Sequence, residues 1–132
     1  MTDDIAGFVD QTIASPDQPV VIFALEWCEF CWSVRKLFQE LGIEYRSVDL
    51  DSVEMQQGDQ GGKIRVALRQ RLDSPTIPQI FVGGQYIGGA TETFDAFNDG
   101  SLQALMKERN ISFDESMRFD AYSFLPKWLH PR

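Results

Sequence analysis

Cysteine and histidine are scarce in this chain of 132 residues, which contains two of the first and one of the second. Two cysteines cannot build a scaffold of several disulfides, and the three residues together are too few for a four-ligand zinc site within one chain. Long hydrophobic runs are also lacking. The longest, Val20 to Leu25, is far shorter than the roughly 20 residues that a membrane-spanning helix needs.

Positive charge is in short supply as well, because 12 lysines and arginines stand against 20 aspartates and glutamates, for a net charge of −8. A chain this acidic repels phosphate backbones, so we expect no nucleic-acid partner. The first residues, Met1 to Asp4, hold no basic stretch before an apolar one, so we expect neither a secretory signal nor a membrane partner. The reducing cytoplasm is therefore the expected location.

The spacing of apolar residues predicts alternating helices and strands. We expect helices over residues 3–14, 29–41, 63–72 and 91–107, strands over 20–25, 43–50, 78–82 and 85–87, and loops over 15–19 and 51–62. The first two strands and the helix between them predict a parallel pair with a right-handed crossover. The Gly83-Gly84 turn adds an antiparallel hairpin. The predicted class is α/β, a small mixed sheet of about four strands flanked by helices.

Three segments are expected along the chain: an N-terminal helix and loop (1–17), a central domain (18–109) and a C-terminal extension (110–132). The extension fits none of the predicted elements but is rich in aromatic residues. Exposed aromatic side chains would adhere to other surfaces, so we expect the extension to pack on the domain or on a partner.

Cys28 and Cys31 stand where the first buried strand meets a helix, within Glu26-Trp27-Cys28-Glu29-Phe30-Cys31. Their spacing places both sulfurs on one helical face. At the helix N-terminus, unpaired N–H groups and the helix dipole favour the thiolate of Cys28. Cys31 lies deeper and can attack a mixed disulfide formed on Cys28. Redox chemistry is therefore predicted, with half of a zinc site or two buried structural cysteines as the alternatives.

Two weaker motifs follow: Thr76-Ile77-Pro78 before a strand, and Gly88-Gly89-Ala90-Thr91-Glu92 between a strand and a helix. With Pro19 to Phe23 and the cysteine motif, they occur in an order and spacing that resembles the glutaredoxin family over roughly residues 18–108. The resemblance implies a thioredoxin-like fold and glutathione-dependent thiol–disulfide exchange. It also implies a cis peptide bond between Ile77 and Pro78, which would dock a substrate in extended pairing.

The same resemblance assigns roles to individual residues. It implies Cys28 as the nucleophile and Cys31 as the resolving cysteine. The glutathione-binding residues would be Arg65, Ile77, Pro78, Thr91 and Glu92, and the substrate groove would hold Trp27, Phe30 and Thr76. In the family pattern, the Ile77 backbone pairs with the cysteinyl part, Thr91 and Glu92 face the γ-glutamyl end, and Arg65 binds the glycine carboxylate. The alternatives are a solvated helix face for Arg65 and ordinary packing for Trp27 and Phe30.

This sequence also departs from the family pattern. Many glutaredoxins have a proline after the first cysteine and a lysine three residues before it, where this chain has Glu29 and Leu25. The carboxylates of Glu26 and Glu29 therefore flank the thiol and disfavour the Cys28 thiolate. They would repel anionic glutathione, or select a basic protein substrate. The usual aspartate after the glycine pair is replaced by Glu92.

The predicted function is a glutathione-dependent oxidoreductase that reduces protein disulfides or glutathione mixed disulfides. Its partners would be glutathione, as co-substrate, and disulfide-containing or glutathionylated proteins, and we expect a monomer. One alternative is a [2Fe–2S] glutaredoxin, a cluster-bridged dimer with Cys28 and glutathione as ligands. Another is a docking domain with weak redox activity that uses the extension. Visible absorbance after anaerobic purification distinguishes the cluster protein.

Overall fold

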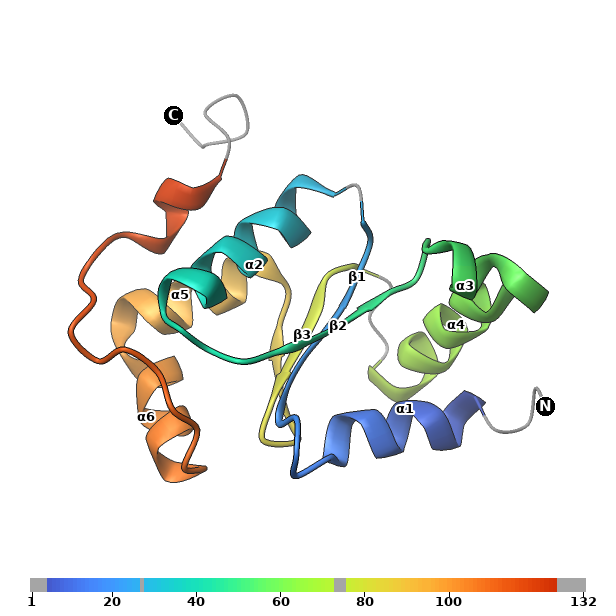
Figure 1. Ribbon diagram of the computed structural model, residues 1–132, viewed down its shortest axis with the longest axis horizontal. Coiled ribbons are helices and arrows are strands. Elements are labelled where there is room, and N and C mark those ends of the chain that lie inside the picture. Colours follow the sequence, from blue (N-terminus) through green and yellow to red (C-terminus); the bar gives the residue numbers. More distant parts are fainter. Residues whose placement is uncertain (1–4, 27, 73–75, 126–132) are drawn as a thin grey trace.

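The computed structural model describes residues 5–26, 28–72 and 76–125, and a four-stranded sheet lies at its centre (Figure 1). The strands are β1 (Val20–Ala24), β2 (Arg46–Asp49), β3 (Gln79–Val82) and β4 (Gln85–Gly88), in the spatial order β2-β1-β3-β4. β1 pairs with β2 in parallel and with β3 antiparallel, and β4 pairs antiparallel with β3. The predicted mixed α/β sheet is confirmed.

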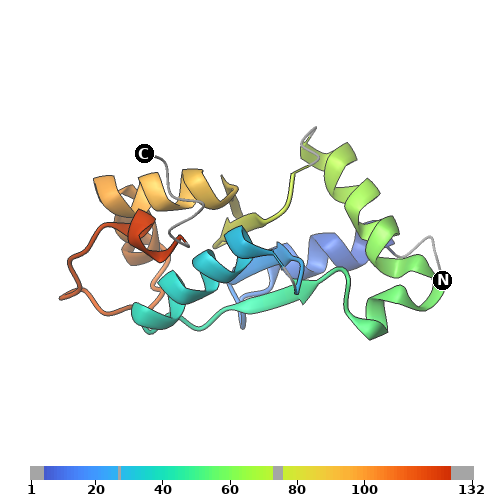
Figure 2. The ribbon, with the colours of Figure 1, turned by 90° about the horizontal axis from the view of Figure 1, so that it is seen from above.

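Helices cover both faces of this sheet (Figures 1 and 2). α1 (Ile5–Ala14) and α4 (Gln60–Leu72) lie on one side, and α2 (Glu29–Glu40) and α5 (Ala90–Asp99) lie on the other. Successive side chains of β1 alternate between the two apolar cores, yet all are buried, which explains its continuous hydrophobic run. Within the described ranges, no helix is both long enough and apolar enough to cross a membrane.

The loop predicted over 51–62 is wrong, because this segment is largely helical. It contains α3 (Val53–Gln56), a 3₁₀ turn η2 (Gln57–Asp59) and the start of α4 at Gln60. The Ser52 hydroxyl caps α3 by accepting a hydrogen bond from the Met55 N–H at 3.3 Å. A Cβ on Gly61 would lie 1.8 Å from the Leu50 carbonyl oxygen. Gly61 therefore allows the close approach of α4 to the end of β2.

The single helix predicted over 91–107 is also wrong, because Gly100 divides it. Gly100 has φ +90° and separates α5 from α6 (Ser101–Glu108). This left-handed conformation ends a helix and is readily adopted by glycine. The Asp99 carboxylate then accepts a hydrogen bond from the Ser101 N–H at 2.7 Å.

Residues 110–125, which include the short 3₁₀ helix η3 (Ala121–Phe124), pack against the outer side of α2 and α5. The Phe119 ring stacks on Phe97 with centroids 5.0 Å apart and meets Phe124 edge-on at 5.1 Å. The Tyr122 hydroxyl donates to the Asp95 carboxylate at 2.7 Å. The aromatic residues of this segment thus extend the core on the α2 and α5 side.

Candidate active site

The two cysteines lie at the start of α2 in different surroundings. Cys28 is the residue that precedes the helix, with extended backbone angles, and its side chain makes no capping hydrogen bond. Its thiol is half-buried, whereas Cys31, one turn later, is fully buried in the core between the sheet and α2. Both are free thiols, and they contact each other. The Cys28 sulfur is therefore open to a reactant from outside, whereas the Cys31 side chain is covered.

Burial raises the pKa of the Cys31 thiol to about 12. The neighbouring Cys28 thiol contributes to this increase, while a hydrogen bond from the Leu25 N–H, 3.4 Å from the sulfur, and the positive charge of Arg35 act in the opposite direction. At neutral pH the Cys31 side chain is therefore a protonated thiol in the free protein. We therefore expect Cys31 to react only after Cys28 has formed a mixed disulfide, which Cys31 can then attack.

This raised pKa predicts that the reduced protein loses stability at high pH. The unfolded chain releases the Cys31 proton near its ordinary pKa of about 8.5, whereas the folded chain holds it until about 12. The contribution is complete below pH 8.5 and declines as the pH rises toward 12. Urea unfolding of the reduced protein at pH 7 and at pH 10 measures the loss. Cys31→Ser should lose less stability between the two values, and an equal loss in both proteins would contradict the prediction.

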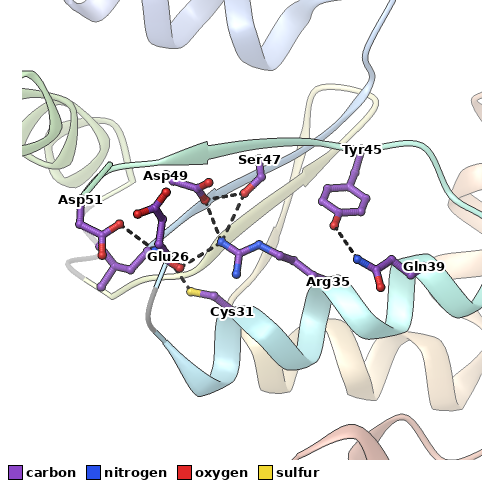
Figure 3. Close-up of polar contacts among 9 residues, drawn as sticks. Glu26, Cys31, Arg35, Gln39, Tyr45, Ser47, Asp49 and Asp51 are labelled. Atoms are coloured by element: carbon purple, nitrogen blue, oxygen red, sulfur yellow. Dashed lines mark hydrogen bonds and ion pairs between the residues drawn. The ribbon is translucent and has the colours of Figure 1, made fainter. Parts of the chain in front are cut away.

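Arg35 extends from α2 to the ends of β1 and β2, close to Cys31 (Figure 3). One guanidinium nitrogen, Nη2, lies 2.8 Å from the Asp49 carboxylate and 3.0 Å from the Leu25 carbonyl oxygen. Ser47 donates to the same carboxylate oxygen at 2.7 Å. The two charged side chains are largely buried, with 17% of Arg35 and 28% of Asp49 exposed. This pair was not predicted from the sequence, although Arg35 follows Cys31 by four residues, which places it on the same helical face.

The end of β2 also holds the chain just before Cys28. The Leu50 N–H donates to the Ala24 carbonyl at 2.8 Å, and the Asp51 carboxylate accepts from the Glu26 N–H at 2.7 Å. The Glu26 and Glu29 side chains are exposed. The predicted acidic surroundings of Cys28 are thus present at the surface, while the backbone beneath them is fixed by the sheet.

A second loop brings the predicted glutathione-binding backbone to the same core. The Ile77–Pro78 peptide bond is cis, as the family resemblance implies. Ile77 is half-buried and packs on the cluster that contains Cys31, as Cys28 also does. Pro78 is buried, and Thr76 is exposed at the surface. The cysteine segment and the Ile77–Pro78 loop are distant in sequence but pack on the same hydrophobic cluster.

The glycine pair places the N-terminus of α5 next to this loop. A Cβ on Gly89 would lie 3.4 Å from the Pro78 carbonyl oxygen, and one on Gly88, where φ is +131°, would lie 2.6 Å from Glu92. Glu92 folds back over its own helix terminus, and its carboxylate accepts hydrogen bonds from the Gly89 N–H at 2.8 Å and the Thr91 hydroxyl at 3.4 Å. Thr91 and Glu92 are exposed, while the Glu92 carboxylate already accepts from the Gly89 N–H at this terminus.

The remaining predicted residues are more dispersed. Phe30 and Trp32 expose 37% and 48% of their surface in the first turn of α2, and sequence analysis did not single out Trp32. Arg65 is exposed on α4, and no hydrogen bond or ion pair within the described ranges engages it. Trp27 lies outside the described residues. The structure therefore joins the cysteine, Ile77 and α5 segments, and Arg65 makes no hydrogen bond or ion pair with their described residues.

Among the residues that the structure describes, no three or more histidine, cysteine or acidic side chains gather to hold a metal ion. A [2Fe–2S] cluster is held by four ligands, usually thiolates. Cys31 is buried and Cys28 is the accessible thiol, so a cluster at this site would need thiolates from outside the chain. The cluster alternative stays a prediction.

Comparison with known proteins agrees with this geometry. The family model named Glutaredoxin matches residues 20–87. Monothiol glutaredoxin-S10 of Oryza sativa subsp. japonica is 33% identical over 108 residues, which cover 82% of this chain and 62% of that protein. Glutaredoxin-C6 of the same species is 34% identical over 98 residues, which cover 74% of this chain and 81% of that protein. The chain thus spans less than two thirds of the first relative and most of the second.

Solved structures show the same likeness. The crystal structure of a buckwheat glutaredoxin–glutathione complex superposes with a TM-score of 0.73 at 30% identity, over 84% of this chain and 94% of that one. A wheat glutaredoxin gives 0.71 at 32% identity, over 81% and 93%. The thioredoxin-like fold expected from the motifs is confirmed. The family match, the relatives and the shared fold agree that this chain belongs to the glutaredoxin family.

Proposed function

We propose that the protein is a glutathione-dependent thiol–disulfide oxidoreductase that reduces protein disulfides and glutathione mixed disulfides. The observation that carries the proposal is the unequal pair of thiols at the start of α2, one half-buried and one fully buried beneath it. An accessible sulfur can attack a substrate disulfide, and a sheltered one can attack only the product of that first step.

The reaction begins when the Cys28 thiolate attacks one sulfur of the substrate disulfide. A new S–S bond joins Cys28 to that sulfur, and the other sulfur leaves as a thiolate, which takes up a proton from solvent. Either glutathione or Cys31 then attacks the mixed disulfide. The N-terminus of α2 supports the first step, because its free N–H groups and dipole stabilise negative charge at Cys28.

Glutathione would lie across the surface formed by Ile77, the α5 terminus and Cys28. The Ile77 backbone would pair with the cysteinyl part, and the N–H groups at Thr91 and Glu92 would bind the γ-glutamyl carboxylate. The buckwheat glutaredoxin whose structure is described as a glutathione complex shares this fold, which supports the proposal.

The direct test is reduction of a glutathionylated peptide by the full chain, with glutathione and glutathione reductase as the coupled system. We expect turnover that depends on both the chain and glutathione. A chain with an intact fold, verified by circular dichroism, and no turnover above the uncatalysed rate would contradict the proposal.

Arg65 offers a more specific prediction within this function. If its guanidinium binds the glycine carboxylate, Arg65→Gln should raise the KM for the glutathionylated peptide by about fivefold and leave kcat unchanged, because an exposed ion pair is worth up to about 1 kcal/mol. Arg69→Gln is the matched control, since Arg69 is exposed one turn further along α4. Equal effects of the two substitutions would point to general attraction of an anion, and no effect of either would remove Arg65 from the binding site.

A further inference from the structure

The chain just before Cys28 is held by three consecutive residues at the end of β2. Leu50 donates from its backbone to the Ala24 carbonyl, and Asp51 accepts from the Glu26 N–H. Asp49 acts through Arg35. The Nη2 nitrogen of Arg35 donates to the Asp49 carboxylate at 2.8 Å and to the Leu25 carbonyl at 3.0 Å. The register that aligns Ala24 with Asp49 in the parallel β1–β2 pair makes these contacts possible.

Leu25 is the residue on which these contacts converge. Its N–H points at the Cys31 sulfur at 3.4 Å, and this N–H belongs to the peptide unit whose carbonyl, on Ala24, is held by Leu50. Its own carbonyl belongs to the next peptide unit, held by Arg35 on one side and Asp51 on the other. Fixing both peptide units fixes the direction of the N–H group. A rotated Leu25 would leave the Cys31 sulfur without a hydrogen-bond donor in a dry site.

We propose that Arg35 is a positioning residue for the second half-reaction, in which it holds Leu25 so that the Leu25 N–H supports the Cys31 sulfur as it attacks. The inference rests on the proposed function and adds to it a residue that acts on Cys31 rather than on Cys28. The positive charge of Arg35, although partly neutralised by Asp49, also assists this attack, because it favours the negative charge that develops on the Cys31 sulfur.

The step in question is disulfide closure. The Cys31 sulfur attacks the Cys28 sulfur of the glutathione mixed disulfide, the Cys28–Cys31 bond forms, and the bond to glutathione breaks. Glutathione leaves as a thiolate and is protonated, and the proton of the Cys31 thiol passes to solvent. Two electrons are transferred to the departing glutathione sulfur, so the step needs no further oxidant.

Closure can be followed directly by mixing the reduced full chain with glutathione disulfide and quenching with acid at intervals. Mass spectrometry then separates the mixed disulfide from the closed form. We expect Arg35→Met to slow the decay of the mixed disulfide about tenfold, which corresponds to about 1.4 kcal/mol of barrier. Arg35→Lys keeps a cation near the Leu25 carbonyl and should recover most of the rate. Asp49→Asn should also slow closure, because Arg35 is then less firmly placed.

Two controls separate positioning from a general effect on the fold. Arg46→Met removes a different arginine, which lies on β2 with its guanidinium over the Phe8 ring, and should leave closure unchanged. In a Cys31→Ser background, Arg35→Met should leave the rate at which Cys28 forms its mixed disulfide unchanged within about twofold. Closure at the unaltered rate in Arg35→Met would overturn the inference, and so would equal slowing of the Cys28 step. A full chain that forms no mixed disulfide would overturn the proposed function and the inference with it.

Discussion

Replacing Cys28 with serine should abolish the reduction of a glutathionylated peptide, with a loss of at least about 10³-fold, because a serine hydroxyl is not ionised at neutral pH and cannot replace a thiolate nucleophile. The buried Cys31 does not substitute for it. Its sulfur has no exposed surface, and its raised pKa keeps it protonated. The measurement is the initial rate in the glutathione reductase-coupled assay.

Replacing Cys31 with serine has a different outcome in the same assay. Glutathione itself can attack the mixed disulfide on Cys28, so Cys31→Ser should keep within about threefold of the unaltered rate. Disulfide closure competes with this route for the Cys28 mixed disulfide, and Cys31→Ser removes that competition. If Cys31→Ser is as inactive as Cys28→Ser, the chain works only through the two-cysteine route and the assignment of glutathione as the resolving thiol is wrong.

Deleting residues 110–132 should destabilise the protein by about 5 kcal/mol, which is comparable with the total stability of a small domain. Ala121 and Leu125 are buried, and the rings of Phe119, Tyr122 and Phe124 pack together with those of α5. Aromatic pairs contribute roughly 0.5–1.5 kcal/mol each beyond the burial of their area. Urea unfolding of the reduced protein measures the loss, and an unchanged midpoint would contradict this account of residues 110–125.

Point substitutions measure how much individual side chains of this segment contribute to the free energy of unfolding. Phe119→Ala should cost about 2 kcal/mol, since this ring contacts both Phe97 and Phe124. Tyr122→Phe should cost about 1 kcal/mol, because it removes the hydrogen bond to Asp95. Ser112→Ala is the control in the same segment, since Ser112 is exposed. If Phe119→Ala and Ser112→Ala have equal effects, the aromatic packing carries none of the stability.

The extension also reaches the helix that bears the cysteines. The Ser33 hydroxyl lies 2.9 Å from the Glu29 carbonyl and 3.1 Å from the Phe124 carbonyl. Ser33 is fully buried two residues after Cys31. Residues 110–125 therefore support the first turns of α2 as well as α5, although they lie outside the part of the chain that the family model matches.

The elements that local patterns predicted correctly are those whose signal is contained in one segment. The continuous apolar run of β1 identified a strand buried on both faces, and Gly83 and Gly84, with φ of +58° and +84°, form the expected tight turn. Glycine led to a wrong prediction where its role depends on contact with a segment elsewhere in the sequence. Gly61 indicated a loop, but it allows a helix to approach the Leu50 carbonyl, which no local pattern reveals.

The same distinction applies to the site. The cysteine spacing and the helix N-terminus were sufficient to place Cys28 and Cys31 on one helical face. The Arg35–Asp49 pair could not be predicted, because it depends on the register between β1 and β2 and on which face of α2 meets the end of that pair. Residues of opposite charge at positions 35 and 49 are common in an acidic chain and carry no such information alone.

The central claim is that Cys28, and not the buried Cys31, is the thiol that attacks an external disulfide and forms the mixed disulfide. The most direct test is peptide mapping by mass spectrometry after each single-cysteine variant is exposed to glutathione disulfide at neutral pH. The account predicts glutathione attached to Cys28 in Cys31→Ser, and no glutathione on Cys31 in Cys28→Ser while the protein stays folded. Ready attachment to Cys31 in the folded Cys28→Ser variant would contradict the claim, because the buried thiol would then be a nucleophile in its own right.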